Sequence, residues 1–257
     1  MRYYKGYIAL SESCDVPVLQ LVRNSRAICF DQLRDLLIHE MLVAVVRSLR
    51  WRVTRLERFG LLTRLDGQRH LGKPVYGITR QGLECLESRG HYMVSLPSDT
   101  EQILHPSKVA HAFELVNIRL AFARSGLLRA WKSELEITSR NLVAPDGAAK
   151  DYDAVAEIEV NGATRRIGVE YERSAKAVSR YANICAALDK DHTTDMVLYL
   201  TPNDDILYLL AMELRATQKR IGFALCDSFR HSLLETRTLS NEGSSEIMPL
   251  RELLLRP

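Results

Sequence analysis

Apolar residues recur at helical spacing in the N-terminal part of the chain. An apolar segment from Val16 to Val22 is followed by a short amphipathic helix, whose apolar face holds Phe30, Leu33, Leu36 and Leu37. A longer helix is predicted from about Leu42 to Phe59, and Gly60 ends it. Its apolar stripe consists of Val46, Leu49, Val53 and Leu56. This spacing predicts three helices in succession.

Two short strands and a further helix come next. The strands L-L-T-R-L and V-Y-G-I-T-R flank the polar segment D-G-Q-R-H-L-G-K-P, and a helix is predicted from Gln81 to Arg89. Three helices followed by a basic β-hairpin are typical of a winged helix-turn-helix. In that fold the third helix enters the major groove of DNA and the hairpin, or wing, lies along the backbone. We therefore predict a winged helix-turn-helix domain over residues 1–92.

Residues 93–107 are predicted to link this domain to a second one. The surrounding segment S-R-G-H-Y-M-V-S-L-P-S-D-T-E-Q-I-L-H-P-S contains two prolines, several serines and no hydrophobic periodicity. The second domain then spans residues 108–257 and begins with a helix that ends at Gly126. The inward positions of this helix are Val109, Phe113, Val116, Leu120 and Phe122 or Ala123.

The second domain alternates strands and helices. Strands are predicted near Glu134–Ser139, at Tyr152–Val160 and Thr164–Glu172, and in the apolar runs M-V-L-Y-L and I-G-F-A-L-C. Helices are predicted at Ala175–Leu188 and Asp204–Lys219. This order predicts an α+β protein of two domains, the second with a mixed sheet covered by helices on both faces. In the C-terminal tail we expect Leu250, Leu253, Leu254 and Leu255 to pack back onto the domain.

Acidic residues gather around the predicted hairpin, whose turn is Asn161 and Gly162. Glu170 and Glu172 project to the same side of their strand, and Asp153 can lie beside them on the neighbouring strand. Three converging carboxylates raise one another's pKa, and a hard divalent cation relieves that repulsion. The spacing predicts a Mg²⁺ or Mn²⁺ site. A solvated strand face is the alternative interpretation, and it is the one that we give to Glu157 and Glu159.

The composition describes a soluble globular protein. The chain has 257 residues, of which 46% are hydrophobic and 26% charged, and this length suits two domains. No apolar run reaches membrane-spanning length, and the N-terminus lacks the apolar core of a signal peptide, so we expect a cytoplasmic protein without a membrane segment. The five cysteines are scattered and form no C-x-x-C pair, which argues against a disulfide framework or a structural zinc.

Positive charge is concentrated in residues 41–80. This stretch holds nine basic and two acidic residues, a net charge of +7, so the rest of the chain carries −4 of the total of +3. Such asymmetry is typical of a polyanion-binding module. We expect groove contacts from Arg47, Arg50 and Trp51, and phosphate contacts from Arg55, Arg64, Arg69, His70 and Lys73, with Arg58 on the same DNA-facing surface. The alternatives are a solvated helix face and a winged helix used for dimerisation.

The order helix, strand, strand with Asp153, strand with Glu170-x-Glu172, helix, strand resembles the PD-(D/E)XK restriction-endonuclease-like core. Together with the N-terminal winged helix, nearly the whole chain resembles the replication-relaxation family, in particular the MobC-type relaxases of mobilisable plasmids. The resemblance implies a metal-dependent endonuclease that binds double-stranded DNA at a plasmid origin of transfer and nicks one strand. The resemblance also implies other relaxosome or coupling proteins as partners. A homodimer is a further possibility, because it would suit either a repressor that binds an operator or a nuclease that cuts both strands.

The resemblance also assigns residues. Asp153 is the first acid of the motif, with Tyr152 in place of the usual proline, and Glu170 is the second acid. Glu172 stands where the superfamily usually has lysine, and Lys176 supplies the ammonium group from one helical turn further on. The metal would be held by Asp153, Glu170 and either Glu172 or the Tyr171 carbonyl. Four further residues have possible accessory roles. Arg173 or Arg180 would bind an adjacent phosphate, and Tyr181 is either a positioning group or a packed aromatic residue. Glu114 is either a further metal ligand or a solvated helix residue.

Two other functions remain open at this point. The first is a DNA-binding regulator or relaxosome accessory protein whose nuclease-like domain is inactive, which the glutamate at position 172 favours. The second is a restriction-like nuclease that makes double-strand breaks. The products separate these possibilities, because a nickase gives open circles, a double-strand nuclease gives linear DNA and a regulator gives neither.

Overall fold

The computed structural model describes residues 8–70, 72–93, 106–144, 150–242 and 246–256. The chain divides into two compact units, Met1–Val116 and Asn117–Pro257. The division falls inside helix α5 (Pro106–Arg124), while most of the predicted linker, residues 94–105, lies outside the described residues. In the part of the chain that is described, no helix is long and apolar enough to cross a membrane.

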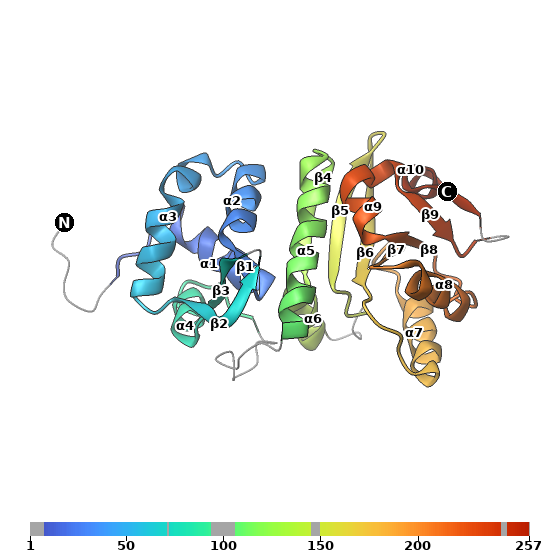
Figure 1. The fold of residues 1–257 in the computed structure, drawn as a ribbon, viewed down its shortest axis with the longest axis horizontal. Helices are drawn as coiled ribbons and strands as arrows, with labels where there is room; N and C mark the ends of the chain where they lie inside the picture. The colour runs from blue at the N-terminus through green and yellow to red at the C-terminus, as the bar shows by residue number, and fades with distance from the viewer. Residues whose placement is uncertain (1–7, 71, 94–105, 145–149, 243–245, 257) are drawn as a thin grey trace. The chain divides into compact units, whose positions relative to one another are not determined.

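The N-terminal unit follows the predicted order of helices and strands. Helices α1 (Asp15–Ser25), α2 (Phe30–His39) and α3 (Val43–Arg58) precede the hairpin strands β2 (Leu62–His70) and β3 (Lys73–Ile78) and helix α4 (Arg80–Glu87). A short strand, β1 (Ile28–Cys29), adds to the hairpin, so the described residues form an antiparallel sheet in the order β1-β3-β2. Figure 1 shows these helices around the small sheet.

Local sequence explains where these helices begin and end. The amide side chain of Gln32 accepts the N–H of Cys29 at the start of α2 (3.2 Å), and the hydroxyl of Thr79 accepts the N–H of Gly82 at the start of α4 (3.0 Å). Gly60 follows α3 with φ of +70°, a conformation that favours glycine. The core between the helices is built from buried leucines and valines: Leu33, Leu36, Leu37, Val45, Leu49, Val53 and Leu56.

The C-terminal unit is built on a mixed sheet. Within the described residues its strand order is β10-β9-β8-β7-β6-β5-β4. The strands are β4 (Leu128–Ser133), β5 (Ala154–Val160), β6 (Ala163–Tyr171), β7 (Met196–Thr201), β8 (Ile221–Leu225), β9 (Arg237–Ser240) and β10 (Ile247–Pro249). The central strands β6, β7 and β8 run parallel, and the outer pairs are antiparallel.

Helices cover this sheet on both faces. Helices α7 (Val178–Lys190) and α8 (Asp204–Glu213) pack on one face, where Leu188 and Leu210 meet Val197 and Tyr199 of β7 in one buried cluster. On the other face Phe122 of α5 contacts Phe229 of α9 (Cys226–Ser232), with ring centroids 5.0 Å apart. Figure 1 shows α8 beside β7 and β8. Every residue of β7 is buried, as expected for a central strand covered on both sides.

The strand predicted near Glu134–Ser139 is wrong, because this segment is helix α6 (Glu134–Val143). The alternation of Leu135, Ile137 and Ser139 with polar residues suggested a strand, and these three residues are indeed buried. A capping box decides the conformation, since Glu136 accepts both the N–H and the hydroxyl of Ser133 at 2.8 and 2.7 Å. The strand of this region is β4, which immediately precedes the cap.

The C-terminal tail contains more structure than the sequence pattern indicated. Strands β9 and β10 extend the sheet beyond β8, and helix α10 (Leu250–Leu255) follows them. Leu250, Leu253 and Leu254 are buried as predicted, whereas Leu255 is 42% exposed. Helix α8 also ends at Glu213, earlier than the predicted Lys219.

Candidate functional site

The β5–β6 hairpin brings Asp153 and Glu170 next to each other. Its turn has left-handed backbone angles at both Asn161 (φ 51°) and Gly162 (φ 78°), as a two-residue hairpin turn requires. From this turn the strands pair without interruption up to Ala154 and Val169. The next pair of positions in this register is Asp153 and Glu170. Cross-strand partners lie on the same face of a sheet, so the two carboxylates are neighbours. Turn chemistry therefore sets the position of both carboxylates.

Asp153 connects the two strands by a hydrogen bond at the open end of this hairpin. Its carboxylate oxygen Oδ2 accepts the backbone N–H of Tyr171 at 2.8 Å. Its negative charge also raises the pKa of Lys150 and of Lys176, against the larger effect of burial, which lowers both. The half-buried Asp153 therefore interacts electrostatically with both lysines.

Lys150 and Glu170 form an ion pair at this end of the sheet, and their side chains are only 12% and 15% exposed. The ammonium nitrogen Nζ also lies 4.3 Å from the centre of the Tyr152 ring, a cation–π distance. Burial lowers the pKa of Lys150 to about 8, with Asp153 acting in the opposite direction. Sequence reasoning missed this lysine, although it stands three positions before Asp153 in the K-D-Y-D segment.

Lys176 and Glu172 form a second ion pair, just beyond the end of β6. Burial lowers the pKa of Lys176; Asp153 opposes this shift and Arg180 adds to it. The backbone N–H of Lys176 donates to the hydroxyl oxygen of Tyr181 at 3.0 Å, and the Tyr181 side chain is buried. Tyr181 thus holds the loop that carries Lys176 and packs in the core at the same time.

The predicted carboxylates are therefore neutralised by two lysines. Among the described residues, no three His, Cys, Asp or Glu side chains are grouped so that they could hold a metal ion. The oxygen donors of Asp153 and Glu170 fit Mg²⁺ or Mn²⁺ in their chemistry, because both ions prefer carboxylate ligands. Glu170 would have to exchange Lys150 for the ion, since its Oε1 is in contact with the ammonium group.

The accessory residues lie in different places. Arg173 and Arg180 are exposed, in the loop after β6 and on α7 respectively. Glu114 lies on α5 within the N-terminal unit and is half-buried. Arg173, Arg180 and Tyr181 are therefore the accessory residues that belong to the same unit as Asp153, and Glu114 does not.

Tyr152 anchors the start of β5. Its hydroxyl donates to Asp191 Oδ2 at 2.9 Å. Burial alone would raise the pKa of Asp191, but hydrogen bonds from Thr193, Thr194 and Tyr152 lower it overall. A Cβ at Gly168 would lie 2.7 Å from the Tyr152 ring, so the ring rests directly on the backbone of β6. Lys150 therefore lies over a ring whose position is fixed by the sheet and by Asp191.

In the N-terminal unit, helix α3 presents a basic face. The exposed side chains of this helix include Arg47, Arg50, Trp51, Thr54 and Arg58. Their spacing places them on one side of the helix, opposite the buried Leu49, Val53 and Leu56. Trp51 is 54% exposed, and the Arg50 guanidinium lies 5.5 Å from the centre of the Phe30 ring.

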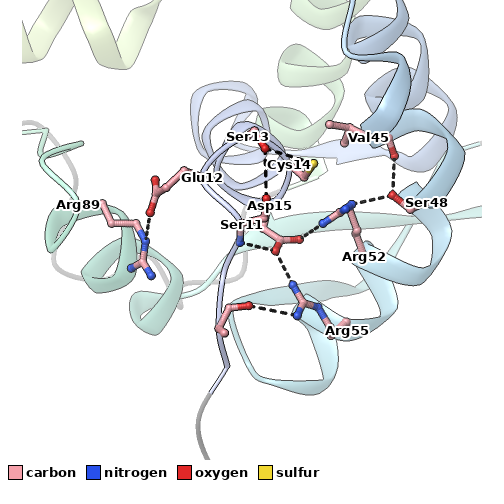
Figure 2. Close-up of polar contacts among 11 residues, drawn as sticks. Ser11, Glu12, Ser13, Cys14, Asp15, Val45, Ser48, Arg52, Arg55 and Arg89 are labelled. Atoms are coloured by element: carbon pink, nitrogen blue, oxygen red, sulfur yellow. Dashed lines mark hydrogen bonds and ion pairs between the residues drawn. The ribbon is translucent and has the colours of Figure 1, made fainter. Parts of the chain in front are cut away.

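Arg55, which we predicted as a phosphate contact, is engaged inside the unit instead. Figure 2 shows the buried Asp15 of α1 between Arg52 and Arg55 of α3. Arg52 Nη1 donates to Asp15 Oδ1 at 2.8 Å, Arg55 pairs with Oδ2, and the N–H of Ser11 also donates to Oδ2 at 2.8 Å. The Arg55 side chain is 12% exposed, and its guanidinium lies 4.7 Å from the Trp51 ring centre. Arg55 therefore packs α3 on α1 and supports Trp51.

The hairpin of this unit carries the remaining predicted contacts. Arg64 pairs with Glu57 (Nε to Oε1, 2.7 Å) and Lys73 pairs with Asp31, and both basic side chains are more than half exposed. Exposed pairs of this kind are weak, so either cation can exchange its partner for a phosphate. The side chains of Arg69 and His70 lie outside the described part of the structure.

Sequence comparisons add no relative to this description. No family model matches the chain, and a search of the curated proteins gives no match. The residues and their geometry therefore carry the functional proposal.

Proposed function

We propose that the protein is a DNA-binding, metal-dependent endonuclease of the PD-(D/E)XK type that nicks one strand at a plasmid origin of transfer. The observation that carries this proposal is the placement of Asp153, immediately before β5, next to Glu170 of β6, with the ammonium groups of Lys150 and Lys176 paired to Glu170 and Glu172. The element order α5-β4-α6-β5-β6-α7-β7 supports it, because it includes every element of the resembled core in sequence, with the additional helix α6 between the first two strands.

Binding to DNA is assigned to the N-terminal unit as a winged helix-turn-helix. In this proposal α3 enters the major groove with Arg47, Arg50 and Trp51, and Arg58 faces the same surface. Arg64 and Lys73 on the β2–β3 hairpin contact phosphates from the wing. Arg52 and Arg55 are assigned to holding α3 in place, because both pair with the buried Asp15.

Phosphodiester hydrolysis is assigned to the C-terminal unit. The oxygen of a water molecule bonds to phosphorus, the bond from phosphorus to one ester oxygen breaks, and that oxygen takes up a proton by way of the solvent. Mg²⁺ or Mn²⁺, held by Asp153 and Glu170 with Glu172 or the Tyr171 carbonyl, would lower the pKa of that water. The lysines stabilise the negative charge that develops on the phosphate oxygens, and Arg173 or Arg180 holds an adjacent phosphate.

One observation favours a second candidate, a DNA-binding protein without nuclease activity. Each of the three acids already has an internal partner: Glu170 pairs with Lys150, Glu172 pairs with Lys176, and Asp153 accepts the N–H of Tyr171. A site neutralised in this way is stable without a metal ion. Such a protein would act as a regulator or as an accessory protein of the relaxosome.

The deciding experiment incubates the purified protein with supercoiled plasmid that carries the DNA flanking its own gene. Mg²⁺, Mn²⁺ and chelator are compared for the wild type, Glu170→Ala and the matched control Glu157→Ala, a half-buried glutamate of β5. Open circles that need metal and Glu170, but not Glu157, support the nickase. Linear product identifies a double-strand nuclease, and intact plasmid together with a gel shift supports the second candidate.

A further inference from the structure

Two contacts hold Lys150 in one place in the C-terminal unit. Its ammonium group pairs with Glu170 of β6 and lies over the ring of Tyr152. The Tyr152 ring is fixed in turn, because its hydroxyl donates to the buried Asp191 and its face rests on Gly168. A long side chain such as lysine is rarely this buried unless it is paired. The ammonium group is therefore confined to the Asp153 and Glu170 end of the sheet.

Lys176 differs from Lys150 in its surroundings. It pairs with Glu172, four residues earlier in the same loop, and its side chain is 28% exposed. This pair is local and neutralises the glutamate that stands at the usual lysine position. Lys150, which precedes β5, is in contrast paired with Glu170 of β6, the second acid of the motif. Lys150 is thus the cation in direct contact with Glu170, whereas Lys176 contacts Glu172, for which the Tyr171 carbonyl is the alternative metal ligand.

An ammonium group and a divalent ion compete for the same carboxylate oxygen, because both need its lone pairs and repel each other at contact distance. We propose that Lys150 is the exchangeable cation of this centre: it neutralises Glu170 when no divalent ion is bound, and it turns to the scissile phosphate when Glu170 binds the ion. This inference rests on the proposed nuclease function and adds to it a residue and an order of events.

The exchange has two opposite consequences for a variant without the ammonium group. Lys150→Met removes the competitor for Glu170, so it binds Mn²⁺ more tightly than the wild type, by about tenfold. It also removes a positive charge from the transition state, so nicking slows by about 100-fold. Lys150→Arg keeps the charge and the pair with Glu170, so its Mn²⁺ affinity stays near that of the wild type. A lysine with a purely structural role would not tighten metal binding when it is removed.

The test measures Mn²⁺ binding by calorimetry and single-turnover nicking of supercoiled plasmid, with folding followed by thermal unfolding. The variants are Lys150→Met, Lys150→Arg and the matched control Lys132→Met, in which a lysine of β4 paired with Glu157 is replaced. Tighter Mn²⁺ binding with slower nicking in Lys150→Met alone is the expected result.

Other outcomes overturn the inference in distinguishable ways. If the wild type nicks DNA and Lys150→Met nicks it equally fast, or binds Mn²⁺ no more tightly, Lys150 is not the exchangeable cation and the nuclease proposal stands. If the wild type neither binds Mn²⁺ nor nicks DNA, the nuclease proposal fails and this inference fails with it. If Lys150→Met does not fold, Lys150→Arg provides the test. The exchange predicts that this variant binds Mn²⁺ as tightly as the wild type, so weaker Mn²⁺ binding by Lys150→Arg excludes it.

Discussion

The hydroxyl of Tyr152 donates a 2.9 Å hydrogen bond to the carboxylate of Asp191, which joins the start of β5 to the loop after α7. The two residues are thirty-nine positions apart and both are buried. The ring of the same tyrosine rests against Gly168 and is 4.3 Å from the ammonium group of Lys150, measured to the ring centre. This bond therefore links the packing of the sheet to the position of the charged groups at its end.

Tyr152→Phe should destabilise the C-terminal unit by about 1 to 2 kcal/mol, because it leaves the buried Asp191 with one hydrogen-bond donor fewer. Urea denaturation followed by circular dichroism measures the change. Tyr208→Phe, at an exposed position of α8, is the matched control and should change the free energy of unfolding very little. Equal free energies of unfolding of the two variants would show that the Tyr152 hydroxyl does not stabilise the fold.

Asp15→Asn should destabilise the N-terminal unit by about 3 kcal/mol, because it removes the negative charge that pairs with both Arg52 and Arg55, whose side chains are largely buried. Glu84→Gln is the control, since its pair with Arg80 is exposed and such pairs contribute about 0 to 1 kcal/mol. Thermal unfolding of both variants separates the two effects. A loss in Asp15→Asn no larger than in Glu84→Gln would contradict this account of the α1–α3 contact.

The same carboxylate makes stability depend on pH. Burial would raise the pKa of Asp15, but hydrogen bonds from Ser11, Arg52 and Arg55 lower it below 3.8 overall. A carboxyl group with a lowered folded-state pKa stabilises the fold fully above its ordinary pKa, and this contribution is lost as the pH falls through the folded-state value. Denaturation of the wild type should therefore become easier below about pH 4, and Asp15→Asn should show a weaker dependence in that range.

Arg47→Ala and Arg50→Ala should each weaken DNA binding by about 1 to 3 kcal/mol without changing the unfolding temperature, because both side chains are exposed on α3. Arg55→Ala should behave differently and lower the unfolding temperature, since it leaves Asp15 with one arginine. Fluorescence anisotropy at several salt concentrations measures the affinity. Arg129→Ala, an exposed arginine of β4, is the control, and an equal loss of affinity in this variant would argue against α3 as the DNA-contacting helix.

Leu253→Ala should destabilise the C-terminal unit by about 2 to 5 kcal/mol, whereas Leu255→Ala should have little effect. The two leucines lie on the same short helix, but Leu253 is fully buried and Leu255 is 42% exposed. Chemical denaturation of the two variants provides the comparison. Similar stabilities would mean that α10 does not pack on the sheet.

Local patterns in the sequence were sufficient for much of the fold. The predicted apolar stripe correctly located α3: Leu49, Val53 and Leu56 are buried, although Val46 is only half-buried. The Asn161 and Gly162 turn correctly predicted the hairpin that places Asp153 beside Glu170. These features depend on residues close together in sequence, where periodicity and turn chemistry determine the backbone. The segment after Ser133 was misread as a strand, because a capping box outweighed an alternating pattern.

Tertiary structure alone decided the partners of the charged groups. Asp15 of α1 meets Arg52 and Arg55 of α3, and Lys150, which precedes β5, meets Glu170 of β6. The sequence placed Arg55 on a DNA-facing surface and gave Lys150 no role, since charge and spacing do not reveal which long side chains meet. Strands β9 and β10 also went unpredicted, because short strands form only when an existing sheet edge offers them hydrogen bonds. The sequence by itself thus determined the local elements and their order, whereas the folded packing determined the pairing and burial of charge on which the proposed chemistry depends.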